Sequence, residues 1–167
     1  CTIEGIVNLA GILVLKPARR CSVDEFDQNI GKNLKSSFAV VKAVGSLLEN
    51  CSVVLLSTAA AGIGLANHEL ISSAKSGVEG LVKSASKTYA RKNIRFNSVA
   101  PGLISTPRSS KIISNPIALK ASEKMHALGR IGEPKDISNM IQFLISPQNN
   151  WITGQNFVID GGLSSTK

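Results

Sequence analysis

The chain has 167 residues, of which 43% are apolar and 4% aromatic, and it carries a formal net charge of +8. This length predicts one domain over residues 1–167, with a core of Val, Ile, Leu and Ala. The charge would suit nucleic acid, but the basic residues are scattered and lack interleaved aromatics. We therefore expect a solvated basic surface and no nucleic-acid partner.

The cysteines and the hydropathy pattern favour a soluble protein of a reducing compartment. Cys1, Cys21 and Cys51 have no metal-ligand spacing, so we expect free thiols, no metal site and a cytoplasmic location. No signal peptide is visible, and the longest weakly polar run, residues 53–66, is too short to span a membrane. The first residue is Cys rather than Met, which predicts that the chain is processed or is a fragment.

Short apolar runs with the length of buried strands alternate with helical patterns along the chain. The predicted strands are residues 5–11, 51–57, 94–100 and 154–160. Ser22 is a good N-cap for the stretch that follows, over residues 22–50, which predicts two helices or one bent helix with a break near Gly31. The later predicted helices are one from an Asn67 N-cap to about Arg91, a short one over residues 118–127, and one with Pro134 near its first turn.

Strands that alternate with helices predict an α/β fold with a parallel sheet and crossover helices. Such sheets bind ligands at the carboxyl ends of their strands. The residues that follow the strands are Gly11, Ser57, Thr58, 101–106 and 160–162. The segment "GIGLAN" also follows a strand and opens a helix, but it has only two of the three glycines of a dinucleotide-binding turn, so a flexible loop is favoured.

Four longer motifs occur in a fixed order. They are "VNLAG", "VVLLST", "SAKSGVEGLVKSASKTYARKNIRFNSVAPGLISTP" and "LGRIGEPKDISNMIQFLISPQNNWITGQNFVIDGG". Together they resemble the short-chain dehydrogenases/reductases (SDR), nearest the 3-oxoacyl-acyl-carrier-protein reductase branch, over nearly the whole chain. The resemblance implies a Rossmann-type, doubly wound parallel sheet and an NAD(P)-dependent oxidoreductase that acts on a small carbonyl or alcohol substrate. It also implies NAD or NADP as the cofactor and a homo-dimer or tetramer.

The resemblance assigns site residues by position. The implied catalytic residues are Asn33, which matches a helix asparagine that holds a proton-relay water, Thr58, which stands at the serine position, and Lys75. The implied cofactor contacts are Asn8, Ala10, Gly11, Lys75, Pro101, Gly102, Ile104 and Thr106. Asn8 is expected to brace neighbouring strands more than to touch the cofactor. In the loop over residues 101–106, a backbone amide and the Thr106 hydroxyl would hold the nicotinamide carboxamide.

Two departures from the family pattern matter. The family's glycine-rich turn and first three strands, which bind the adenosine and pyrophosphate, would precede Cys1, so the chain corresponds to the C-terminal two-thirds of an SDR domain. One edge of its first strand would then be exposed. The second departure is Ile71, which stands four residues before Lys75, at the position of the family's catalytic tyrosine.

His68 is a candidate replacement for that tyrosine. It lies seven residues before Lys75, which is the spacing at which related enoyl reductases place their tyrosine. A nearby lysine cation would favour the neutral ring, which can polarise a carbonyl by donating its N–H. The alternative is that His68 only forms a hydrogen bond at the helix end. Glu69 points away around the helix, Tyr89 is expected to be structural, and His126 is expected at the surface or in a loop.

Two functions therefore stay open. The first is an NAD(P)-dependent oxidoreductase with an atypical active site. The alternative is a non-catalytic SDR-like subunit or a nucleotide-binding protein, and Ile71 is its best support, because an isoleucine side chain can neither donate a proton nor hydrogen-bond a carbonyl.

Overall fold

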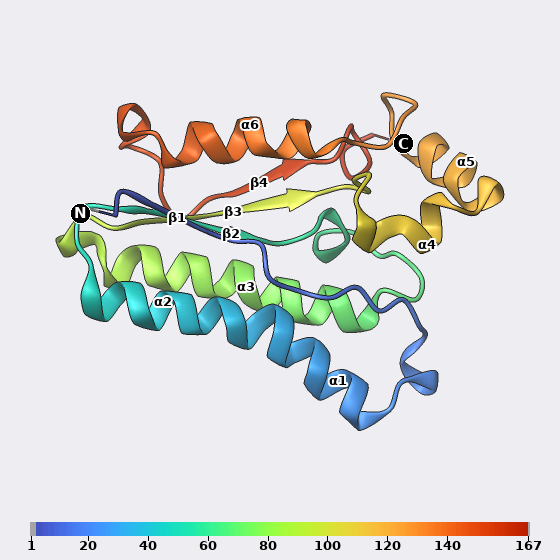
Figure 1. Cartoon of the computed structure of the whole chain (residues 1–167), viewed down its shortest axis with the longest axis horizontal. Helices are drawn as coiled ribbons and strands as arrows, with labels where there is room; N and C mark the ends of the chain where they lie inside the picture. Colours follow the sequence, from blue (N-terminus) through green and yellow to red (C-terminus); the bar gives the residue numbers. More distant parts are fainter. Residues whose placement is uncertain (1–2, 167) are drawn as a thin grey trace.

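The computed structural model describes residues 3–166, so Cys1 lies outside the described residues. The centre of the molecule is a parallel sheet with the strand order β1-β2-β3-β4. The strands are β1 (Gly5–Asn8), β2 (Ser52–Leu56), β3 (Arg95–Pro101) and β4 (Asn156–Ile159). The predicted strands and the parallel sheet are confirmed. Because all these strands run in one direction, their carboxyl ends meet at a single edge (Figure 1).

Helices cover both faces of the sheet (Figure 1). On one face lie α1 (Val23–Ile30), α2 (Ser36–Leu47) and α3 (Glu69–Thr88), and on the other lies α6 (Pro134–Ile145). The short helices α4 (Ser110–Ile113) and α5 (Pro116–Met125) lie beyond the carboxyl edge. A parallel sheet covered on both faces is the arrangement of a doubly wound, Rossmann-type fold.

The stretch between β1 and β2 is a bent helix. The hydroxyl of Ser22 accepts from the Glu25 amide at 3.1 Å, while the Glu25 carboxylate accepts from the Ser22 amide at 3.0 Å, so α1 begins with a capping box. A π-helical turn over Gly31–Lys35 joins α1 to α2. The predicted cap and the predicted break near Gly31 are both confirmed.

Helix α3 packs its apolar stripe against the sheet. The buried apolar residues of this helix are Leu70, Ile71, Ala74, Val78, Val82 and Ala85. The predicted N-cap at Asn67 is wrong, and the N-cap is His68. Asn67 has a left-handed backbone with φ of 65°, whereas His68, with φ of −104°, is the residue that directly precedes the first helical residue, Glu69. Beyond the helix, the rings of Tyr89 and Phe96 pack with their centroids 5.8 Å apart, so Tyr89 is structural, as expected.

Alternate residues of β2 point to opposite faces and enter separate apolar clusters. Between the sheet and α2 and α3, the fully buried members include Val53, Leu55, Val78 and Phe96. Under α6 they include Val54, Val99 and Leu144. These clusters fix the distance between the helices and the sheet, and with it the place of side chains at the carboxyl edge.

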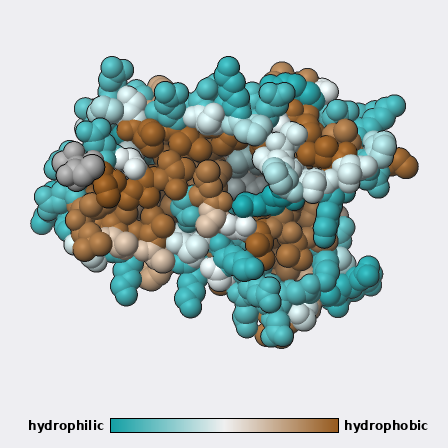
Figure 2. Space-filling view, viewed as in Figure 1, coloured by the Kyte–Doolittle hydropathy of each residue, from teal (hydrophilic) through white to brown (hydrophobic). Residues whose placement is uncertain are grey.

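Strand β1 is an edge strand, because within residues 3–166 it pairs with β2 alone. Ile3 and Leu9, which flank it, are 50% and 58% exposed. In the face of the molecule that Figure 2 shows, apolar side chains gather on the half where the amino ends of the strands lie. The predicted exposed edge is therefore present in the described part of the chain. No helix within residues 3–166 has both the length and the apolar content needed to cross a membrane.

Candidate active site at the carboxyl edge of the sheet

Lys75 is the buried cation of the site. It comes from the inner face of α3, is 5% exposed, and its Nζ donates to the backbone oxygen of Leu56 at 2.7 Å. Leu56 is the last residue of β2, so the ammonium lies at the carboxyl edge. Burial, assisted by the charge of Arg108, lowers the pKa of Lys75 to about 8. No acid pairs with Lys75 within the described residues.

The hydroxyls that follow β2 differ in their partners. Ser57 is buried and donates to Oε1 of Glu79 at 2.6 Å, so it belongs to the packing between α3 and the sheet. Thr58 is half-buried, and its Oγ1 accepts from the Ala60 amide at 3.4 Å as the cap of a short 3-10 turn. Among residues 3–166, no group accepts the hydroxyl hydrogen of Thr58. The Thr58 hydroxyl therefore keeps a hydrogen that no described residue accepts, and its catalytic role stays a prediction.

Asn33 clamps the loop that follows β1. Its amide nitrogen donates to the Ile12 oxygen at 3.1 Å and to Oδ1 of Asn29 at 2.8 Å, while its own Oδ1 accepts from the Ile12 amide at 3.3 Å. It is 1% exposed, and a Cβ on Gly11 would collide with its Oδ1. The structure thus gives Asn33 a bracing role, and the proton-relay role stays a prediction.

Asn8 is the last residue of β1, and Ala10 lies in the loop that follows it. Nδ2 of Asn8 donates to Oγ of Ser37 at 3.2 Å, and its Oδ1 accepts from the Ala10 amide at 3.0 Å. The expectation that the Asn8 side chain braces neighbouring strands is therefore wrong, because both of its hydrogen-bond partners lie outside the sheet. It braces the loop and α2 instead, because its side chain points out of the sheet toward the helix layer.

Sequence reasoning missed Arg108. It lies in the short 3-10 turn that follows β3, and its Nη2 donates to the Leu9 oxygen at 3.4 Å. This contact links the loop after β3 to the loop after β1, across the end of β2. The only signal in the sequence was its place shortly after the "PG" that ends a predicted strand.

The loop over residues 101–106 has one free amide. Its other amides are occupied: Gly102 donates to Ile159 O at 3.1 Å, Leu103 to His126 Nε2 at 3.2 Å, Ser105 to Gly132 O at 2.8 Å and Thr106 to Ser109 Oγ at 3.1 Å. Within residues 3–166, no group accepts from the amide of Ile104. The Ile104 amide is thus free to donate to a ligand, and its contact with a cofactor stays a prediction. The Thr106 hydroxyl lies 3.2 Å from Oγ of Ser109, so it is shared with the protein.

His68 and Ile71 occupy the start of α3. Ile71 is 5% exposed and part of the core. His68 is half-buried, and its Nδ1 lies 2.8 Å from the Ala66 oxygen. A carbonyl oxygen only accepts, so Nδ1 carries the hydrogen, and in the neutral ring Nε2 is an acceptor. The expectation that neutral His68 donates an N–H to a ligand is therefore wrong for this rotamer. Glu69 does not orient the ring, since its carboxylate accepts from the Ala18 amide at 3.3 Å.

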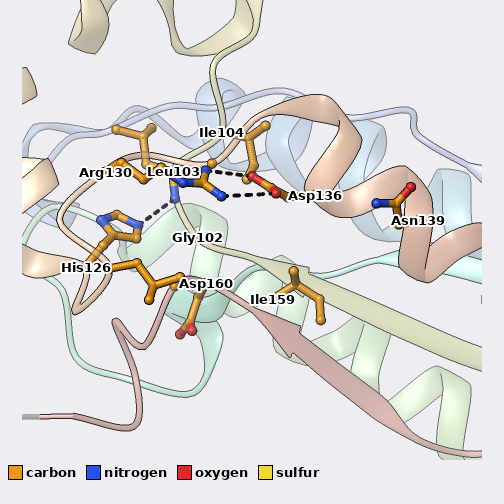
Figure 3. A pocket seen from close by; sticks show the side chains of 12 residues that line it. Gly102, Leu103, Ile104, His126, Arg130, Asp136, Asn139, Ile159 and Asp160 are labelled. Atoms are coloured by element: carbon orange, nitrogen blue, oxygen red, sulfur yellow. Dashed lines mark hydrogen bonds and ion pairs between the residues drawn. The ribbon is translucent and has the colours of Figure 1, made fainter.

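A cavity of about 200 Å³ lies against the 101–106 loop, and neither Thr58 nor Lys75 lines it. It is lined by Gly102, Leu103 and Ile104 on one side and by His126, Arg130, Asp136 and Asp160 on others (Figure 3). Of the two positions expected for His126, the loop is confirmed, because the residue follows α5 in a bend, and the surface is wrong, because the side chain is 4% exposed. Its side chain is covered by the backbone at Gly102 and Gly161, which lies directly against it.

Metal chemistry finds no support in the described part of the chain, where no group of three or more His, Cys, Asp or Glu side chains is arranged to hold an ion. Cys21 and Cys51 are free thiols, and burial raises the pKa of Cys51. The candidate groups that the structure does bring to the carboxyl edge are Thr58, Lys75, Arg108 and the Ile104 amide.

A doubly wound parallel sheet with a buried lysine, a hydroxyl and a free amide at its carboxyl edge has the arrangement of α/β proteins that bind ligands at that edge. The family model described as enoyl-(acyl carrier protein) reductase matches residues 1–164. The chain belongs to the short-chain dehydrogenase/reductase family.

Individual relatives cover most of this chain. The tropinone reductase homolog At2g29260, chloroplastic, of Arabidopsis thaliana is 33% identical over 162 residues, which are 95% of this chain and 50% of the relative. A solved 4-hydroxyisoleucine dehydrogenase complexed with NADH has a TM-score of 0.91 at 30% identity, over 98% of this chain and 69% of that one. The angucycline C-6 ketoreductase LanV with bound NADP has a TM-score of 0.91 at 22% identity, over 98% of this chain and 63% of that one, which shows the fold alone. The chain spans 50% to 62% of the length of the first three curated relatives it matches.

Proposed function

We propose that the chain is the nicotinamide-binding and catalytic portion of an NAD(P)-dependent oxidoreductase that interconverts a carbonyl and an alcohol. The observation that carries the proposal is the bond of 2.7 Å between Nζ of Lys75 and the Leu56 oxygen. This bond holds a buried cation at the edge where a parallel sheet binds its ligand. The Thr58 hydroxyl follows two residues after Leu56, so donor and cation are neighbours.

The residues at this edge fit the nicotinamide half of NAD(P). The free Ile104 amide is a donor for the carboxamide oxygen, and the Lys75 ammonium is a donor for the ribose hydroxyls. Gly11 has no room for a side chain, because a Cβ there would collide with Oδ1 of Asn33, so the loop after β1 packs closely at this point. When bound, the cofactor supplies the hydride chemistry, and the chain binds, orients and handles the proton. The NADH bound to the related 4-hydroxyisoleucine dehydrogenase supports this choice.

Proton transfer is the step in which this chain departs from its family. We assign Thr58 to the hydrogen bond on the substrate oxygen and His68 to the proton. Because the Ala66 oxygen occupies Nδ1–H, the neutral ring offers Nε2 as a base, which suits alcohol oxidation. Carbonyl reduction through His68 requires a second proton on the ring. A water held near Asn33 is the alternative donor, and both routes bypass Ile71.

A second candidate is a non-catalytic SDR-like subunit that binds nucleotide without turnover. Two observations favour it. Ile71 fills the tyrosine position with an apolar side chain that is 5% exposed, and Nδ1 of His68 is already engaged by the backbone. Both candidates share the nicotinamide site, so binding alone does not separate them.

Turnover separates the two candidates. The longest available polypeptide that contains residues 1–167 is assayed in both directions. Secondary alcohols are tested with NAD⁺ or NADP⁺, and the matching ketones with NADH or NADPH. The oxidoreductase proposal expects turnover that falls at least about 100-fold in Lys75→Met and is kept in Lys83→Met, an exposed lysine of the same helix. Absence of turnover in both the parent and Ile71→Tyr would favour the non-catalytic subunit.

Assembly and compartment belong to the same proposal. Phe38 and Leu47 on α2 are 54% and 78% exposed, which supports burial of this helix in a homo-dimer or tetramer. The free thiols of Cys21 and Cys51 support a reducing compartment such as the cytoplasm. Sedimentation of the purified protein tests the first point, and fractionation of the source cells tests the second.

A further inference from the structure

His126 is a buried titratable side chain that the proposed reaction does not use. It is the C-cap residue of α5. Its ring bridges that helix and the 101–106 loop. Nδ1 lies 2.7 Å from the Ser122 oxygen, and Nε2 lies 3.2 Å from the amide nitrogen of Leu103 (Figure 3).

These two contacts fix the tautomer of the ring. The Ser122 carbonyl can only accept, so Nδ1 carries a hydrogen. The Leu103 amide can only donate, so Nε2 is unprotonated. Both contacts therefore hold together only while the ring is neutral, because a proton on Nε2 would face the amide hydrogen of Leu103.

The contact with Leu103 sets the shape of the ligand loop. A Cβ on Gly102 would lie 2.7 Å from Nε2, so the loop backbone packs directly on the ring. With the Leu103 amide occupied, the neighbouring amide of Ile104 is the one that faces a ligand. A part-buried amide that loses its acceptor destabilises its conformation, so the loop would rearrange if the ring withdrew.

We propose that His126 is a positioning residue that holds the 101–106 loop in its ligand-binding shape, and that a second proton on its ring releases the loop and weakens nicotinamide binding. The inference rests on the proposed nicotinamide site. It adds a pH-sensitive connection between α5 and that site, through a residue that touches no substrate.

Among the charged groups around the ring, Asp160 is the one that favours a second proton on His126. Asp160, at the end of β4, lines the same cavity, and its carboxylate accepts from the amides of Gly162 at 3.0 Å and Ser164 at 2.8 Å. Although burial opposes it, these bonds and the charge of His126 lower the pKa of Asp160, so an anion persists to attract a protonated ring. Arg130 and Asp136 pair with each other at 2.8 Å on the α6 side. The backbone amide of His126 donates to the backbone oxygen of Glu123, on α5, at 3.2 Å.

Matched variants separate positioning from packing. Glutamine places a terminal amide where Nε2 lies, so His126→Gln keeps an acceptor for Leu103 that does not titrate. Asparagine places its amide where Nδ1 lies, so His126→Asn keeps the contact with Ser122 and loses the contact with Leu103. Hydrogen exchange of the Leu103 amide, resolved by NMR in the 167-residue chain without ligand, reports the contact itself.

We expect exchange at Leu103 about tenfold faster in His126→Asn than in the parent, and near-parental exchange in His126→Gln. Binding of reduced nicotinamide mononucleotide should weaken by about the same factor in His126→Asn alone. As the pH falls, the parent should lose affinity relative to His126→Gln, whose amide takes up no proton. Equal behaviour of the Asn and Gln variants, or the same pH profile in parent and Gln variant, would overturn the inference. If Leu103 behaves as expected while no nicotinamide compound binds the parent, the proposed function fails instead.

Discussion

Gly11 and Asn33 fit together so closely that a Cβ at position 11 would collide with the side-chain oxygen of Asn33. The same Asn33 side chain bonds both the amide and the oxygen of Ile12. The loop after β1 is thereby clamped to the π-helical turn between α1 and α2. This clamp fixes one wall of the site independently of any ligand.

The clamp predicts a stability effect. Gly11→Ala should lower the free energy of unfolding by about 2 kcal/mol, because Asn33 must move and its bonds to Ile12 must lengthen. Gly64→Ala is the matched control, since nothing lies within 4 Å of a Cβ placed there. Urea denaturation of both variants measures the difference. Equal midpoints for the two alanine variants would show that the loop is not clamped.

Burial of Lys75 predicts a pH dependence of stability. Burial, with the charge of Arg108, lowers the pKa of Lys75 from 10.5 to about 8. Between these two values the unfolded chain binds the proton and the folded chain does not, so the free energy of unfolding should rise with pH across this window, by at most about 3 kcal/mol. Below about pH 8 both states are protonated and the penalty of the buried cation is fully present.

Denaturation at about pH 7.5 and about pH 10.5 measures this rise. Lys75→Met should abolish the contribution, while Lys83→Met should keep it, because Lys83 is exposed on the same helix. A rise of the same size in the parent and in Lys75→Met would place its origin in another group.

His68 predicts a direction for the chemistry. His68→Phe should lower turnover of a catalytically active parent about 100-fold while leaving cofactor affinity nearly intact, because affinity depends on Lys75 and the Ile104 amide. The parent should favour alcohol oxidation over ketone reduction, since the Ala66 oxygen already holds the one hydrogen of the neutral ring and leaves Nε2 as a base. Steady-state rates for the parent, His68→Phe and Ile71→Tyr with one panel of ketones and the matching alcohols measure both effects. Full turnover in His68→Phe would make the histidine a helix-end residue only.

The free edge of β1 predicts self-association of the 167-residue chain. Ile3 and Leu9 flank the strand and are 50% and 58% exposed. The substitutions Ile3→Lys and Leu9→Lys should therefore reduce light scattering at high concentration. Ile117→Lys is the control, because Ile117 is 83% exposed but lies on α5. A parent chain that stays monomeric at high concentration would contradict the prediction.

The sheet and most helices could be predicted because their signals are local. Alternation of apolar runs with helical spacing gave the order of strands and helices, and Ser22 and Gly31 marked a cap and a break that the structure confirms. The cap of α3 could not be predicted in the same way. Asn67 and His68 are both plausible by residue type, and only the left-handed backbone of Asn67 decides between them.

The site was predictable where a motif fixes the residue and not where side chains from distant segments meet. Lys75 and Thr58 lie at the predicted edge. Arg108 and His126 were missed as contributors, because their partners Leu9 and Leu103 are 99 and 23 residues away in sequence. No periodicity or spacing signals a histidine ring that accepts from a backbone amide 23 residues away.

The central claim is that the carboxyl edge binds the nicotinamide half of the cofactor through Lys75 and the Ile104 amide. Titration of the 167-residue chain with reduced nicotinamide mononucleotide, followed by NMR, tests it most directly, because this compound lacks the adenosine half. The predicted result is weak, saturable binding near millimolar that shifts the Ile104 amide, worth about 4 kcal/mol. NADH should bind at most about tenfold more tightly than reduced nicotinamide mononucleotide. Lys75→Met should abolish the binding of both compounds, and Lys83→Met should leave it intact. Shifts that are absent in the parent, or unchanged in Lys75→Met, would contradict the claim.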